Sequence, residues 1–130
     1  MNDSLPLVSD RDIVLARQET RNLARQLGLS IVDQTKIVTA VSELARNAVV
    51  HGGGGSLRCE IVTSDGKQGL RLTVSDEGPG IADLNLAMKD GWTSGSGLGI
   101  GLPGARRLVN EFHITSERGR GTTVVVTRWK

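Results

Sequence analysis

The sequence predicts an α+β fold, a two-layer sandwich in which helices cover one face of a mixed, mostly antiparallel sheet. Two N-terminal segments carry apolar residues at the 3.6-residue spacing of amphipathic helices. From Leu57 onward the apolar period changes to two, which is typical of half-buried strands. Turn sequences between the strands, such as Asp65-Gly66, are typical of hairpins and therefore of antiparallel pairing.

Two long helices are expected in the N-terminal part of the chain. Ser9 or Asp10 can cap the first helix, and Gly28 ends it. Ser30 opens the second helix, which closes at His51-Gly52 and carries the most regular apolar stripe of the chain. The residues of this stripe are Ile37, Val38, Val41, Leu44, Ala45, Ala48 and Val49.

Five strands and a third helix complete the expected order, which is strand, helix, helix, strand, strand, loop, helix, strand, strand. The strands are predicted over Leu5–Val8, Leu57–Val62, Leu70–Ser75, His113–Glu117 and Thr122–Trp129. The third helix is predicted over Leu102–Phe112, with Pro103 tolerated in its first turn. Residues 77–100 are rich in glycine and are expected to be irregular, with Leu84–Met88 as a candidate short helix.

The run HGGGGS, from His51 to Ser56, contains the repeat unit of a flexible linker. It could therefore join two domains or turn the chain within one. A chain of 130 residues has the usual size of one domain, and a cut at Gly53 would leave two pieces that are each marginal alone. We therefore expect a single domain over residues 1–130, with Gly52 as the helix stop and a bend after it.

Composition and charge exclude several classes of protein. The single Cys59 excludes an internal disulfide, and no Cys/His cluster has the spacing of a metal site. The N-terminus lacks a basic stretch followed by an apolar run, so a cytoplasmic protein with no membrane segment is expected. Arginines gather near the C-terminus without interleaved aromatic residues, which favours a solvated face or a docking face for an acidic partner over nucleic-acid binding.

Glu43 and Asn47 lie four residues apart on the second predicted helix, so they are neighbours on its surface. A helical wheel places them roughly opposite the Val41 stripe. One interpretation is a solvated pair on an exposed face. The other is that a second element covers this face, in which case the carboxylate can act as a general base and the carboxamide oxygen can serve a metal.

Asp76 continues the strand face of Leu70, Leu72 and Val74, so its carboxylate is expected to point toward the inside of the fold. A half-buried carboxylate is costly without a hydrogen-bond donor. The segment Asp76–Gly80, DEGPG, is also good turn sequence, so the residue could simply form a turn. The alternative is a ligand that offers an N–H group, such as the exocyclic amine of a base, with Gly78 and Gly80 allowing close approach.

The run GSGLGIGLPGARRL, from Gly95 to Leu108, contains a formal match to the dinucleotide motif G-x-G-x-x-G. That motif must follow a strand, and Thr93–Ser96 is not one. The run also lacks the Gly-Lys-Ser/Thr of a P-loop. What remains is a glycine-rich backbone at the start of a helix, which either presents N–H groups to a phosphate or is a flexible helix entry.

Three segments, in order, resemble the N, G1 and G2 boxes of the GHKL (Bergerat-fold) ATPase and kinase superfamily. They are ELARN (Glu43–Asn47), DEGPG (Asp76–Gly80) and GLGIG (Gly97–Gly101), and GRGTT (Gly119–Thr123) is a candidate further box. The resemblance covers almost the whole chain. The chain is most similar to the small serine/threonine kinases of bacterial anti-sigma systems, in particular to the switch kinases of the stressosome.

This resemblance implies a site for ATP and Mg²⁺ and a role for each matching residue. It implies that Glu43 is the catalytic base, that Asn47 binds Mg²⁺ and that Asp76 accepts a hydrogen bond from the adenine amino group. The further nucleotide-binding residues that it implies are Gly78, Gly80, Ile81, Gly97, Leu98, Gly99, Ile100, Gly101, Leu102 and Thr122, with residues 83–96 as an ATP lid. The resemblance also implies phosphorylation of a STAS-domain antagonist protein and activation of a PP2C-type phosphatase.

One departure from the family pattern concerns the γ-phosphate. Some relatives carry a basic residue just before the second glycine box, but here Lys89 is the nearest. Four other cations remain as unassigned substitutes, namely Lys36, Arg46, Arg106 and Arg107. The alternative functions are a non-catalytic module whose protein binding depends on ATP, a stand-alone ATPase and, more remotely, a DNA-binding protein.

Overall fold

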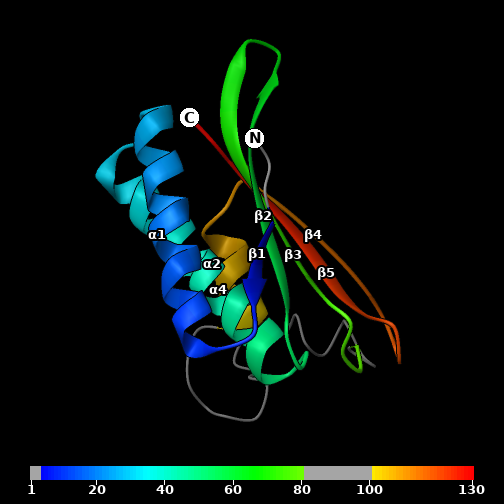
Figure 1. The fold of residues 1–130 in the computed structure, drawn as a ribbon. Coiled ribbons are helices and arrows are strands. Elements are labelled where there is room, and N and C mark those ends of the chain that lie inside the picture. Colours follow the sequence, from blue (N-terminus) through cyan, green and yellow to red (C-terminus); the bar gives the residue numbers. More distant parts are fainter. Residues whose placement is uncertain (1–3, 81–100) are drawn as a thin grey trace.

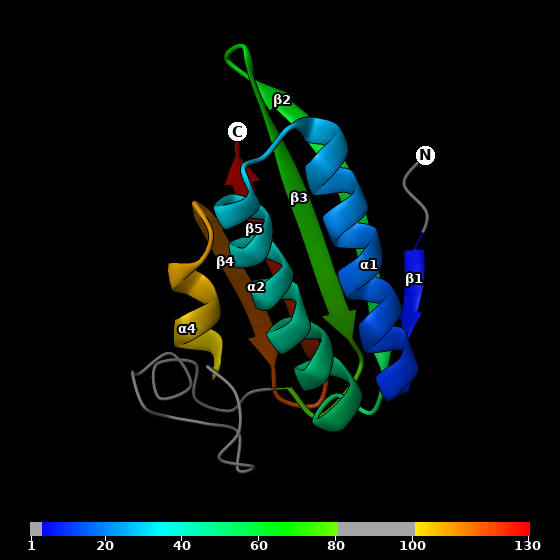
Figure 2. The same cartoon turned by 90° about the vertical axis from the view of Figure 1, so that its left-hand side faces the viewer.

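Two long helices, α1 (Asp10–Leu27) and α2 (Ile31–Val50), lie side by side on one face of a five-stranded sheet (Figures 1 and 2). The computed structural model describes residues 4–80 and 101–130. A short helix, α4 (Gly101–Arg107), packs beside α2 on the same face. The predicted α+β sandwich with helices on one face is therefore confirmed.

The sheet has the strand order β1-β2-β3-β5-β4. Its strands are β1 (Ser4–Leu7), β2 (Gly55–Ser64), β3 (Lys67–Asp76), β4 (Glu111–Glu117) and β5 (Gly121–Trp129). All four pairings among the described strands are antiparallel, so this part of the sheet is antiparallel and not mixed. Both predicted hairpins are present, because β2 pairs with β3 and β4 pairs with β5.

Aliphatic side chains between the two layers form the core. Alternate residues of β3 point toward the helices, and Leu70, Leu72 and Val74 are all buried. The α2 stripe meets them with fully buried Ile37, Val41 and Leu44. Fully burying one such side chain stabilises the fold by about 1.5–3 kcal/mol, so this face is what fixes α2 on the sheet. None of the helices in the described residues is long and apolar enough to cross a membrane.

Glycine and serine define the ends of the two long helices, as predicted. Gly28 adopts a left-handed conformation with φ 87°, and its N–H donates to the carbonyls of Ala24 and Arg25. The Ser30 hydroxyl accepts a hydrogen bond of 3.1 Å from the Asp33 backbone N–H at the start of α2. The short segment between these caps brings α2 back antiparallel to α1.

The predicted third helix is too long. It ends at Arg107, and Phe112 belongs to β4, where it pairs with Val126 of β5. Asn110 makes the turn, since its N–H donates to the Thr127 carbonyl and its side chain accepts from the Trp129 N–H at 2.7 Å. Val109 therefore packs against the core from a turn, and Phe112 packs against it from a strand. Their helical spacing in the sequence is a coincidence. The candidate helix over Leu84–Met88 lies outside the described residues.

The glycine run between α2 and β2 connects elements of one sheet and helix layer. β1, which precedes the run in sequence, pairs with β2, which follows it. The helix already ends at Val50, and Gly55 is the first residue of β2. The Gly54 N–H donates to the Ala48 carbonyl at 2.8 Å, so the turn is tied back to the helix. The run therefore turns the chain from α2 into β2 of the same sheet.

Candidate nucleotide-binding and catalytic site

Glu43 is buried, with only 5% of its surface exposed, because the N-terminus of α4 covers it. Its Oε1 accepts a hydrogen bond of 3.0 Å from the Gly101 backbone N–H. A carboxylate at the first N–H of a helix is favoured by the charge and by the helix dipole. The interpretation of Glu43 as part of an exposed, solvated face is therefore wrong, and the alternative of a face covered by a second element is correct.

The other oxygen of Glu43 lies near a cation. Arg46 Nη1 is 3.7 Å from Glu43 Oε2, and the Arg46 side chain is 44% exposed. Asn47, one turn further along α2, is half-buried, and its carbonyl accepts from the N–H groups of His51 and Gly52. Glu43 and Asn47 thus lie on consecutive turns of α2. The Gly101 N–H contacts one oxygen of the Glu43 carboxylate, and Arg46 lies near the other.

Asp76 is the last residue of β3 and is half-buried. Its Oδ1 accepts a hydrogen bond of 3.0 Å from the Gly78 N–H, which is the geometry of an Asx turn. Among the described residues no donor contacts Oδ2. The two interpretations of Asp76 are therefore compatible, because one oxygen shapes the turn and the other can accept a hydrogen bond from a ligand.

Glycines bring the end of α2 into direct contact with Asp76. A Cβ at Gly52 would lie 2.7 Å from Asp76 Oδ2, and a Cβ at Gly78 would lie 2.6 Å from the Gly52 carbonyl oxygen. Real Cβ atoms do not approach other atoms so closely, so neither position accommodates a side chain without a shift. The glycines let α2 and the Asp76 turn meet backbone to backbone.

The hairpin between β4 and β5 supports the turn from the other side. The Gly119 N–H donates to the Pro79 carbonyl at 2.7 Å, and a Cβ at Gly80 would clash with the Glu117 carbonyl. Thr122 pairs with Asp76 across β5 and β3, and its hydroxyl lies 2.8 Å from that of Ser116. The structure thus brings Asp76, Gly78, Gly80 and Thr122 together.

The second glycine box is described only at its end. Gly101 has φ 69°, a conformation that favours glycine, and Leu102 is buried at the start of α4. The other predicted residues of this box and of the segment after Gly80 lie outside the described residues. They are Ile81, Gly97, Leu98, Gly99 and Ile100, together with the predicted lid over residues 83–96.

The described residues suit ATP and Mg²⁺ in their chemistry. Gly52 and Gly78 pack the end of α2 tightly against the Asp76 turn, which carries a carboxylate oxygen that can accept from an exocyclic amine. Within residues 4–80 and 101–130 no group of three or more His, Cys, Asp or Glu side chains could hold a metal alone. Mg²⁺ usually takes one or two protein oxygens and completes its shell with phosphates and water, so a carboxamide such as that of Asn47 suffices.

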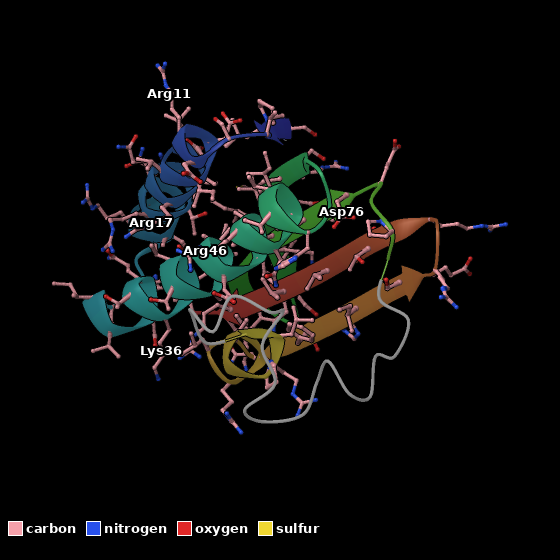
Figure 3. All side chains as sticks on the ribbon, turned by 90° about the horizontal axis from the view of Figure 1, so that it is seen from below. Arg11, Arg17, Lys36, Arg46 and Asp76 are labelled. Atoms are coloured by element: carbon pink, nitrogen blue, oxygen red, sulfur yellow. The ribbon has the colours of Figure 1, made fainter. Side chains whose placement is uncertain are left out.

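A groove of about 300 Å³ opens between α1 and α2 and reaches the candidate base. Its lining residues are Arg17, Arg21, Thr35, Val38, Thr39, Ser42, Glu43 and Arg46. Figure 3 shows Arg17 and Arg46 on neighbouring helices, with Asp76 at the end of β3. Among the four cations considered as substitutes near the γ-phosphate, Arg46 lies 3.7 Å from Glu43 Oε2.

The fold and these segments define a class of protein. The chain belongs to the histidine kinase-, DNA gyrase B- and HSP90-like ATPase family, whose model matches residues 32–130. It is 45% identical to the serine/threonine-protein kinase RsbT of Bacillus subtilis (strain 168), over 99% of this chain and 98% of that protein. This similarity confirms the predicted enzyme class, a protein serine/threonine kinase.

Other relatives extend the comparison. The chain is 34% identical to an anti-sigma F factor of Geobacillus thermodenitrificans, over 87% of this chain and 86% of that protein. A crystal structure of the RsbU and RsbW domains of a Mycobacterium tuberculosis protein matches all of this chain and 32% of that chain, with a TM-score of 0.68 and 25% identity. The mycobacterial sensor histidine kinase MprB shares the fold, with a TM-score of 0.58 at 16% identity.

Sequence reasoning missed two groups of residues at this site. The sequence predicts Gly52 only as a helix stop and includes Gly121 only within the candidate box GRGTT, yet both contact the Asp76 turn at backbone distance. The signal was a run of glycines longer than a helix cap requires. Arg17 and Arg21 were not singled out either, although their spacing of four residues places them on one face of α1.

Proposed function

We propose that the chain transfers the γ-phosphate of Mg-ATP to a serine or threonine of a STAS-domain antagonist protein in a bacterial, cytoplasmic partner-switching pathway. We also propose that it binds and activates a PP2C-type phosphatase once it is released from that antagonist. The observation that carries the proposal is the placement of Glu43, buried yet bordering an open groove and oriented by the first N–H of α4. A module that only binds ATP does not need such a carboxylate.

Glu43 would act as the general base for the acceptor hydroxyl. The Gly101 N–H fixes Oε1, and Arg46 lies beside Oε2, so the carboxylate keeps one orientation. A base held in place contributes about 10²–10⁴-fold to such a reaction. The residue thus needs to accept one proton from the hydroxyl as the oxygen attacks the phosphorus, while the bond to the leaving ADP oxygen breaks.

Asp76 and Asn47 would position the nucleotide. Asp76 Oδ2 can accept a hydrogen bond from the adenine amine, while the close packing of Gly52 and Gly78 fixes the turn that carries the carboxylate. The Asn47 carboxamide would hold Mg²⁺, which supplies charge stabilisation at the phosphates. Gly78, Gly80 and Thr122 shape the adenine end, and Gly101 and Leu102 begin the helix at the phosphate end.

The test is a transfer assay with labelled ATP, Mg²⁺ and the STAS-domain proteins of the same genome. Glu43→Gln keeps an oxygen for the Gly101 N–H but cannot take a proton, so transfer should fall about 100-fold or more while ATP affinity stays within about twofold. Glu60→Gln, the same change at a half-buried residue of β2 outside the site, should transfer at the wild-type rate. Transfer by Glu43→Gln at the wild-type rate would show that another group is the base.

A non-catalytic binding module is the second candidate, and the similarity to anti-sigma F factors favours it. In that case ATP would set the affinity for a protein partner without being consumed. Complex formation would then depend on ATP, survive Glu43→Gln and be lost in Asp76→Ala, and no labelled phosphate would appear on the partner. A pull-down with and without ATP, read alongside the transfer assay, separates the two functions.

A further inference from the structure

The groove between α1 and α2 has the dimensions of a peptide-binding site. It extends from Thr35 to Arg46 on α2, which is about 16 Å along the helix axis at 1.5 Å per residue. An extended chain covers that distance with about five residues. Glu43 and Arg46 lie at one end of the groove, so a segment bound there would have one of its side chains next to the candidate base.

The groove is strongly basic. Arg17 and Arg21 line its α1 side and Arg46 lines its α2 side, and the only acidic side chain among the described lining residues is the buried Glu43. Neither Arg17 nor Arg21 forms an ion pair with any residue in the described ranges 4–80 and 101–130.

Two acidic residues of the same helices, Asp12 and Asp33, are engaged elsewhere. The Asp12 carboxylate accepts from the N–H groups of Val8 and Ser9 at the start of α1. Asp33 forms an ion pair of 2.6 Å with Arg128 of β5. These carboxylates therefore do not neutralise the groove arginines, and the positive charge there stays available to a partner.

We propose that this groove binds an acidic segment of the substrate protein, next to the serine or threonine that is phosphorylated. Arg17 and Arg21 would pair with carboxylates of that segment, and Thr39 and Ser42 offer hydroxyls to its backbone. The acceptor hydroxyl would then lie at the Glu43 end. This inference rests on the proposed kinase function and adds the chemistry by which the protein substrate is recognised.

A nucleic acid fits the groove less well. Among residues 4–80 and 101–130 no aromatic side chain lines it, so these residues offer bases nothing to stack on. The Glu43 carboxylate at one end would also repel a phosphate backbone that ran the whole length. A peptide whose acidic residues flank a neutral hydroxyl matches this lining better, because arginines lie around the Glu43 carboxylate.

The test compares the double variant R17E/R21E with the matched double variant R11E/R25E. Both reverse two exposed or half-exposed charges on α1, but Arg11 and Arg25 do not line the groove. Each protein is titrated with a fluorescein-labelled peptide of alternating Asp and Ser, with its lysine and serine counterpart, and with labelled duplex DNA. Each is also assayed for phosphate transfer to the STAS-domain proteins and for ATP affinity.

The expected result is that R17E/R21E binds the acidic peptide about tenfold or more weakly and raises the KM for the protein substrate by a similar factor. Its ATP affinity and its kcat should stay within about twofold, and R11E/R25E should match the wild type. The inference fails if R17E/R21E binds the peptide and the substrate as the wild type does, if R11E/R25E loses as much, or if the lysine peptide or the DNA binds as tightly as the acidic peptide.

The same measurements distinguish this inference from the proposed function. If the wild type transfers no phosphate but its binding of the acidic peptide still depends on Arg17 and Arg21, the kinase function is wrong and the acidic docking site stands. If transfer depends on Glu43 but is unchanged in R17E/R21E, the kinase function stands and the docking site is wrong.

Discussion

Gly52 has a role that its place in a glycine run conceals. Its Cα lies against the Asp76 side chain, and an added Cβ would come within 2.7 Å of Oδ2. Gly53, the next residue, has nothing within 4 Å of an added Cβ, although its φ of 70° is unusual for other residues. The two neighbouring glycines thus have different structural roles. Gly52 allows close packing, and Gly53 allows only a backbone turn.

Replacing Gly52 with alanine should therefore displace the Asp76 carboxylate and weaken ATP binding by about tenfold or more, which corresponds to about 1.4 kcal/mol. Isothermal titration with Mg-ATP measures this directly. Gly53→Ala is the matched control and should cost about 1 kcal/mol of stability through strain while leaving ATP affinity within about twofold. Equal ATP affinities for the wild type and Gly52→Ala would show that Asp76 does not contact the nucleotide.

At the level of elements, an ion pair joins the start of α2 to the end of β5. Asp33 and Arg128 form an ion pair of 2.6 Å whose side chains are 29% and 16% exposed. Arg128 Nη1 also donates to the Leu108 carbonyl, and its Nε is buried with no partner within the described part of the chain. The guanidinium therefore depends on Asp33 for its one short contact, and it joins α2, β5 and the segment after α4.

Asp33→Ala should lower the free energy of unfolding by about 1–3 kcal/mol, because it leaves a largely buried guanidinium without its carboxylate. Urea unfolding with an unchanged m value measures the loss. Glu117→Ala provides the comparison, because it removes a carboxylate 3.4 Å from Arg120 in a pair that is mostly exposed. That change should cost less than about 1 kcal/mol, and an equal loss in both variants would contradict the account.

Elements whose apolar residues follow one clear spacing could be predicted from the sequence. Segments whose apolar residues fit both a helix and a strand could not. The stripe of α2 and the alternation of β2 and β3 lead to the observed helices and strands within a few residues. The third helix was extended to Phe112 because Leu108, Val109 and Phe112 also fit a helical spacing. Phe112 is in a strand because it pairs with Val126 of β5. Such pairing between strands cannot be detected in the local periodicity of the sequence.

At the level of the whole molecule, the site is assembled from segments that are far apart in sequence. Glu43 and Gly101 are separated by 58 positions, yet they share a hydrogen bond. The burial of Glu43 therefore could not be read from its own helix, where it falls opposite the apolar stripe. The motif residues could be identified from the sequence, but their mutual support through Gly52, Gly121 and Arg46 follows only from the packing of α2 on the sheet.

In the proposed function, one nucleotide contacts three of these segments at once. Addition of Mg-ATP to ¹⁵N-labelled protein, followed by NMR, tests this most directly. The backbone amides of Asn47, Gly78 and Gly101 should all shift, with one common Kd and a stoichiometry of one, and Asp76→Ala should abolish the three responses together. Shifts confined to one segment, or three segments that titrate with different Kd values, would contradict a single site built from α2, β3 and α4.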